Sequence, residues 1–115
     1  MQKTGAPDQE MPSMSQNIAP PEACHSMTEL RAAIDALDAR LVAMLALRQT
    51  YIERAAVLKS DRGTVRDTPR VEQVVQNVVA EAVRQGLSPE IAEAVWRSLI
   101  EASIAHEFKA FDAKR

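Results

Sequence analysis

Apolar side chains recur at steps of three and four residues between Thr28 and Asp61, a stretch that contains no Gly and no Pro. This spacing places them on one face of an α-helix. Residues 26–29 read Ser-Met-Thr-Glu, the S-x-x-E form of a capping box, which predicts a helix start near residue 27. The apolar stripe comprises Leu30, Ile34, Leu37, Leu41, Leu45, Ile52 and Ala55. The pattern therefore predicts one long first helix.

A turn and a second helix follow. Gly63 is suited to the left-handed position that commonly ends a helix. Asp67 or Thr68 is a good N-cap, because Pro69 then occupies the first helical position, where its missing N–H costs nothing. The next segment is rich in valine, which favours strands, but its valines also recur at three and four residues. We therefore predict a second helix that stops at Gly86.

The third segment begins with the same combination of cap and proline, at Ser88 and Pro89. Its apolar positions keep the helical spacing to the end of the chain. They are Ile91, Val95, Leu99 and Ile104, with Trp96, Ile100, Phe108 and Phe111 alongside. The predicted fold class is all-α, a three-helix domain over residues 27–115 with one long N-terminal helix.

The first helix is too long for a chain of this size. Its 34 residues would span about 51 Å, whereas a globule of some 90 residues has a radius of gyration of about 12 Å. A helix longer than its own domain needs apolar cover from another chain. We therefore expect a helical oligomer, most simply a two-fold homodimer.

Residues 1–26 differ in composition from the rest, with four of the six prolines and no aromatic residue. We expect a flexible tail whose end can pack locally. The net charge of −2, from 14 Lys+Arg and 16 Asp+Glu, argues against nucleic acid or an anionic membrane as partner. A single cysteine, Cys24, without a Cys/His cluster predicts neither an internal disulfide nor a metal site and suits the cytoplasm. No segment is apolar enough to span a membrane.

Two cations interrupt the apolar stripe of the first helix. Arg48 and Lys59 are eleven residues apart, which places them within about 20° of one azimuth and about 16 Å apart along the axis. Cationic side chains that point into the core need anionic partners, either from the protein or from a ligand. Alternatively, each side chain reaches out to solvent or pairs with one of the many carboxylates.

Polar residues also lie on the inner face of the third helix, where Ser103 and Glu107 follow Trp96 and Ile100. The plain structural alternative is that Ser103 bonds its own backbone and Glu107 bridges to Lys59 or Arg48. Near the start of the second helix, Asp67 and Arg70 have equally ordinary explanations, as a cap and a surface residue. Together, however, these positions predict a pocket for a small polyanion that carries hydroxyl groups.

These residues resemble the all-helical chorismate mutases. The resemblance covers residues 27 to about 111 and rests on L-R-x-x-I-D-x-L-D at 30–38, V-R-D at 65–67 and S-x-x-x-E at 103–107, with Arg48, Lys59 and Arg70 in order between them. It implies an intertwined homodimer in which each of two sites borrows Arg31 from the partner. Arg31 lies seventeen residues before Arg48, about 260° around the helix and about 25 Å away, so it cannot serve the same pocket within one chain.

The resemblance implies a cofactor-free pericyclic rearrangement of the dicarboxylate chorismate to prephenate, a step of the shikimate pathway towards aromatic amino acids. Arg48 and the partner's Arg31 would then grip the carboxylates, with Arg70 assisting. Lys59 would donate to the ether oxygen and a carboxylate, Asp67 would bind the ring hydroxyl, and Ser103 would support a carboxylate. We expect Lys59, Glu107 and Arg48 to be catalytic and the others to bind substrate.

Two positions depart from the commonest bacterial pattern of these mutases. Glu107 stands where many members have Gln. A carboxylate would repel the charge that develops on the ether oxygen, so we expect Glu107 to act protonated, a form that burial favours, and activity to fall as pH rises. Val71 stands where a Glu usually helps to hold the ring hydroxyl.

At Val71 the sequence also resembles the isochorismate pyruvate lyase branch of the fold, which makes salicylate and pyruvate. Pro-Glu-Ala-Cys at 21–24 and Ile-Ala at 104–105 are further points of resemblance to this branch. The V-R-D loop favours the mutase. A third alternative, a non-catalytic helical dimerisation or regulatory module, predicts inward cations that are paired with carboxylates and no stabilisation by a ligand.

Overall fold

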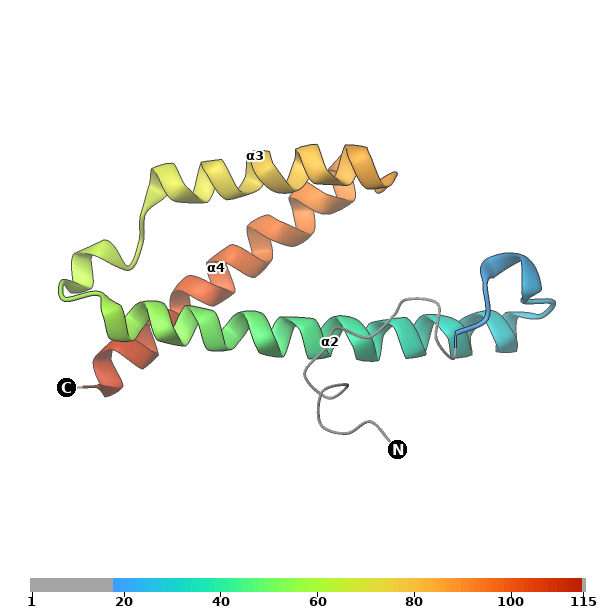
Figure 1. Ribbon diagram of the computed structural model, residues 1–115, viewed down its shortest axis with the longest axis horizontal. Coiled ribbons are helices and arrows are strands. Elements are labelled where there is room, and N and C mark those ends of the chain that lie inside the picture. The colour runs from blue at the N-terminus through green and yellow to red at the C-terminus, as the bar shows by residue number, and fades with distance from the viewer. Residues whose placement is uncertain (1–17, 115) are drawn as a thin grey trace, which may run out of the picture. The chain divides into compact units, whose positions relative to one another are not determined.

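The computed structural model describes residues 18–114, and its elements are drawn in Figure 1. Over this range the secondary structure is helical, with no strand. In chain order the elements are η1 (Pro21–Ala23), α2 (Met27–Leu58), η2 (Arg62–Thr64), α3 (Thr68–Gln85) and α4 (Pro89–Ala113). The predicted all-α fold with one long and two shorter helices is confirmed.

The start of α2 is fixed by the predicted capping residues. The Oγ of Ser26 accepts a hydrogen bond from the backbone N–H of Glu29 at 3.1 Å. The Glu29 carboxylate reaches back to the backbone N–H of His25 at 2.7 Å. Two N–H groups at the helix entry, which would otherwise lack partners, are thereby satisfied.

The helices α3 and α4 begin, and α3 ends, where they were predicted to. The Asp67 side chain caps α3 by accepting from the backbone N–H of Arg70 at 3.1 Å. Gly86 ends α3 with φ of 80°, in the left-handed region that glycine adopts without strain. Ser88 Oγ then caps α4 by accepting from the N–H of Ile91 at 3.3 Å. A short turn therefore reverses the chain between two packed helices.

The prediction for Gly63 was wrong. Gly63 lies inside η2, and Gly86 is the one glycine with positive φ in the part of the chain that the structure describes. The reason is Asp61, whose carboxylate accepts from the N–H of Gly63 at 3.0 Å while its carbonyl accepts from Thr64. This arrangement makes a 3-10 turn that needs no left-handed residue, and α2 ends at Leu58, three residues earlier than the expected 61.

The chain divides into two compact units, with the division inside α2 at residue 48. The C-terminal unit, residues 49–114, contains the end of α2 together with η2, α3 and α4. Its buried cluster joins all of these elements except η2, and Val65 brings in the loop that follows η2. The cluster comprises Ala56, Val65, Val75, Ile100, Ile104 and Phe111, with Val71, Val74, Val79, Trp96, Phe108 and Ala110 packed against it.

The N-terminal unit has no comparable core, since none of residues 18–48 is buried. Within it, residues 18–24 lie against the first turns of α2 and line, together with α2, a partly open apolar pocket of about 470 Å³. The predicted flexible tail falls mostly on residues 1–17, which lie outside the described residues. The expectation that its end packs locally fits residues 18–24, which include the short helix η1.

Large apolar side chains on the N-terminal part of α2 are open to solvent in the single chain. Ile34, Leu41 and Leu45 are 46%, 54% and 42% exposed, although they follow the predicted stripe. A second chain that covers them would explain the stripe. The two-fold dimer stays a prediction.

None of the helices within residues 18–114 combines the length and the apolar character that crossing a membrane requires. The same residues contain no group of three or more His, Cys, Asp or Glu side chains placed to hold a metal ion.

Candidate active site

Lys59 directly follows the last residue of α2, and its side chain turns toward α4. Its backbone N–H still donates to Ala55 O at 3.0 Å, so the helical path continues to this residue. Its ammonium group donates to Glu107 Oε2 at 2.7 Å and to the carbonyl of Val65 at 3.4 Å. Because an ammonium has three N–H donors, one donor is left for a ligand.

Glu107 is the buried charged residue of the described chain, with 5% of its surface exposed. It lies on α4 between the core residues Ile104 and Phe111. The Lys59 side chain is 29% exposed, so the pair lies at the edge of the core and not in its centre. This ion pair compensates a carboxylate that would otherwise be costly to bury. It is also the bridge that the plain structural alternative predicts.

A second contact holds the same stretch of α4 to α2. The ring Nε2 of His106 lies 2.7 Å from Glu53 Oε2. This hydrogen bond from His106 is the largest of the causes that lower the pKa of Glu53 from its ordinary value. Two successive α4 residues, His106 and Glu107, therefore contact two residues near the end of α2, Glu53 and Lys59.

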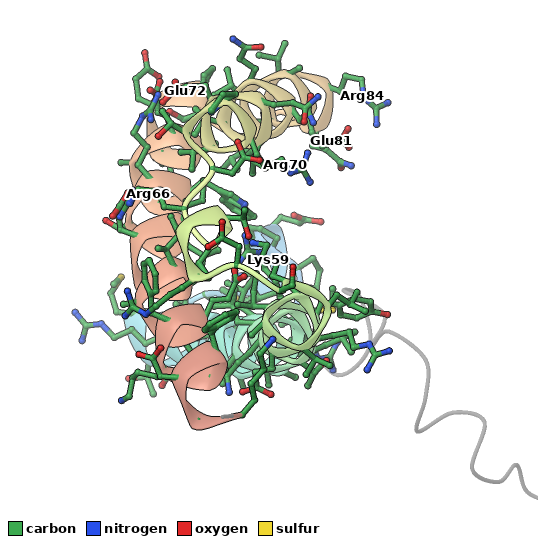
Figure 2. The ribbon with its side chains drawn as sticks, turned by 90° about the vertical axis from the view of Figure 1, so that its left-hand side faces the viewer. Lys59, Arg66, Arg70, Glu72, Glu81 and Arg84 are labelled. Carbon is green, nitrogen blue, oxygen red and sulfur yellow. The ribbon has the colours of Figure 1, made fainter. Side chains whose placement is uncertain are left out.

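The loop between α2 and α3 is anchored by Val65, which is buried in the core. Arg66 points away and makes two hydrogen bonds to the Glu101 carboxylate, at 2.7 and 3.0 Å. The side chain of Arg70 bonds Gln73 at 2.7 Å. Figure 2 shows Lys59 and Arg70 on one side of α4, between α3 and the end of α2, while Arg66 lies on the other side.

Asp67 has the local role of a helix cap, and Ser103 lies on the inner face of α4. Oδ1 of Asp67 forms the α3 cap, which leaves Oδ2 as an acceptor. Ser103 is half-buried, one helical turn before Glu107 and about 40° from it around α4. Both residues belong to the same unit as Lys59 and Glu107.

The remaining predicted site residues, Arg31 and Arg48, lie in the N-terminal unit. Arg31 is exposed on α2. Arg48 is half-buried, and this burial lowers the pKa of its guanidinium group below the ordinary value. The structure thus brings Lys59 and Glu107 into direct contact, places Asp67, Arg70 and Ser103 in their unit, and leaves the two N-terminal arginines to the other unit.

Comparison with known families identifies the fold. The family model described as chorismate mutase type II matches residues 30–108, which is more than half of the chain. The chain belongs to this family. The match spans α3 and most of α2 and α4, and it includes all seven predicted site residues.

One curated relative of this chain is the isochorismate pyruvate lyase of Pseudomonas aeruginosa. It is 27% identical over 89 residues, which cover 77% of this chain and 88% of the relative. The two comparisons thus name different reactions: the family description names chorismate mutase, and the relative is named isochorismate pyruvate lyase.

Sequence reasoning missed the contacts that hold the Lys59 segment in this family member. These contacts are the hydrogen bond between His106 and Glu53 and the bonds from Lys114 to carbonyls at the end of α2. The signal was present in the spacing, because Lys114 lies seven residues, or two helical turns, after Glu107 and shares its face of α4. Glu53 was hidden because its partner lies 53 residues away in sequence.

Proposed function

We propose that this chain is a chorismate mutase, which converts chorismate to prephenate without a cofactor. The observation that carries the proposal is the Lys59 ammonium, held at 2.7 Å by Glu107 and 3.4 Å from the Val65 carbonyl with one N–H left over. Membership in the chorismate mutase type II family supports the same reaction. The step belongs to the shikimate pathway, which leads to aromatic amino acids.

The rearrangement breaks the ether C–O bond of the substrate while a new C–C bond forms. Negative charge grows on the ether oxygen in the transition state, so a fixed donor there lowers the barrier. The third N–H of Lys59 supplies that donor. Glu107 holds the Lys59 ammonium in place through the 2.7 Å ion pair.

Substrate binding in this proposal uses the predicted arginines. Arg48 and the Arg31 that a partner chain donates grip the two carboxylates, with Arg70 assisting. The free Oδ2 of Asp67 accepts from the ring hydroxyl, and Ser103 supports a carboxylate. Each charge-assisted hydrogen bond contributes about 1.5–3 kcal/mol, and together they hold the flexible side chain over the ring.

A homodimer is part of the proposal, supported by the exposed apolar stripe of α2 and by the angular position of Arg31. Mixing two inactive variants, Arg31→Ala and Lys59→Met, tests it. A mixed dimer has one site with the intact Lys59 of one chain and the intact Arg31 of the other. Random exchange makes half of the dimers mixed, so about a quarter of wild-type activity returns. No recovery after exchange would place Arg31 and Lys59 in the same chain's site.

The second candidate is isochorismate pyruvate lyase activity, and a specific observation favours it. Val71, which departs from the usual mutase residue, packs against the buried cluster. The site therefore lacks the second carboxylate for a ring hydroxyl, and the named relative is a lyase. The V-R-D loop, with Asp67 capping α3, favours the mutase instead.

Separate incubation of the purified chain with chorismate and with isochorismate decides between these reactions. We expect prephenate from chorismate. Salicylate and pyruvate from isochorismate, with no prephenate from chorismate, would reverse the assignment. Failure to turn over either compound, together with no rise in melting temperature on adding a bicyclic dicarboxylate that mimics the transition state, would leave the non-catalytic helical module.

A further inference from the structure

One side chain near the end of α4 bonds three carbonyl groups at the end of α2. The ammonium group of Lys114 donates to Ala56 O at 2.7 Å, to Lys59 O at 2.6 Å and to Val57 O at 3.4 Å. These three acceptors use all of the N–H donors that an ammonium carries. Figure 1 shows the end of α4 lying beside the end of α2, where these bonds form.

These bonds replace a conventional helix C-cap. The last carbonyls of a helix have no partner within the helix, and many helices satisfy them by ending on a left-handed glycine. No glycine follows α2 at once, because residues 59–61 are Lys, Ser and Asp. Ala56 is also 1% exposed, so its surroundings leave little room for water. Lys114 therefore provides the cap, and its positive charge suits the negative end of the helix dipole.

One face of α4 contacts both the side chain and the backbone of Lys59. Glu107 and Lys114 are two helical turns apart, within about 20° of one azimuth and about 10.5 Å along the axis. Glu107 binds the side-chain Nζ of Lys59, while Lys114 binds its backbone carbonyl. Between them, Phe111 is buried in the core, with Lys114 Nζ 4.2 Å from the centre of its ring.

The residues just after Lys59 are tied to α4 as well. The guanidinium of Arg62 makes two hydrogen bonds to Asp112, at 2.9 and 3.2 Å. It also lies 4.5 Å from the centre of the Phe108 ring. Both sides of Lys59 are thus attached to the last two turns of α4.

We propose that Lys114 is a positioning residue that fixes the ammonium of Lys59 for catalysis. This inference rests on the proposed function, in which Lys59 donates to the ether oxygen. Without Lys114, the last turn of α2 loses three hydrogen bonds and the Lys59 backbone is free to shift. Because catalytic donors must keep their place within about 0.5 Å, such a shift lowers the rate more than it lowers affinity.

The test is Lys114→Met, which keeps the length of the side chain and removes its donors and charge. We expect kcat to fall roughly tenfold to a hundredfold while KM changes by less than about threefold. Lys114→Arg, which keeps charge and donors, restores at least half of the activity. The control is Lys109→Met, the same chemical change at an exposed α4 lysine that makes none of these contacts, and its kcat stays at the wild-type value.

A readout independent of turnover is amide hydrogen exchange. Lys114→Met accelerates exchange at residues 56–62 and leaves the middle of α3 unchanged, measured well below the melting temperature. A kcat within twofold of wild type in folded Lys114→Met overturns the proposal, even if its melting temperature falls. Should Lys114→Met not fold, Lys114→Gln is measured with the same expected loss of kcat and the same criterion.

Wild-type turnover in the same assay separates this inference from the proposed function. If the wild type turns over neither chorismate nor isochorismate, the proposed function fails and so does a catalytic role for Lys114. If the wild type is active and Lys114→Met is equally active, the positioning role alone fails.

Discussion

The two units of the chain differ in what covers their apolar side chains. In the C-terminal unit, residues from α2, α3 and α4 bury one another around Ile100, Ile104 and Phe111. In the N-terminal unit, an equally regular stripe on α2 stays open, with Leu41 and Leu45 roughly half exposed. Helical periodicity therefore identifies an apolar face, but it does not say whether the same chain or a second chain covers it.

The difference between the two units is tested most strongly by placing a charge on the exposed apolar stripe of α2. We expect Leu41→Glu to abolish dimer formation and with it activity, because an unpaired carboxylate would be buried in the interface. A loss of about 2 kcal/mol or more in association is expected if Leu41 is one of the few residues that carry most of the binding energy of the proposed interface. Molecular mass by sedimentation and the melting temperature check the result.

The matched control for this charge is Ala39→Glu, on the opposite side of α2. It keeps the wild-type mass. A Leu41→Glu protein with unchanged mass, stability and activity would mean that the stripe is open in solution.

The C-terminal unit is tested most directly at Lys59. We expect Lys59→Met to lower kcat by about 10²–10³, the usual loss for one preorganised donor at a developing oxyanion. It also leaves Glu107 buried without its cation, at a cost of about 2 kcal/mol, less than the 3–5 kcal/mol of a fully buried pair because Lys59 is partly exposed.

A double variant separates these two effects of Lys59. Lys59→Met combined with Glu107→Gln removes the unpaired charge, so stability returns toward wild type while activity stays low. Chemical denaturation and steady-state rates measure the two quantities. Recovery of the rate together with stability would show that the ion pair is structural only.

The smallest effect concerns Glu53, whose pKa is lowered mainly by the hydrogen bond from His106. Because the folded pKa lies below the unfolded one, the stabilisation is present above the ordinary value of 4.5 and is lost as pH falls through the folded pKa. We therefore expect the melting temperature of Glu53→Gln to depend less on pH below 4.5 than that of the wild type. Both side chains are partly exposed, so the difference is modest.

Much of this fold follows from local sequence signals. Ser26, Asp67, Gly86 and Ser88 all act as helix caps where their residue types predict them. The wrong assignment of Gly63 shows the limit of such signals. A glycine suits a left-handed cap, but the Asp61 carboxylate two residues earlier stabilised a 3-10 turn instead.

The site was predictable only in part. Spacing along one helix identified Lys59 and Glu107 as inward charges, and the structure pairs them. The ties from Glu53 to His106 and from Lys114 to the α2 carbonyls join residues more than 50 positions apart, so they depend on how the helices pack. No local pattern contains that information.

The short segment that precedes α2 affects which residues should be kept when the chain is shortened for experiments. Residues 18–24 lie before the 30–108 span that the family shares, yet they shelter the flank of the helix that includes Leu30 and Leu37. A protein shortened to residues 30–108 would expose this apolar surface to other molecules in solution. Retaining the segment from residue 18 onward keeps that flank shielded.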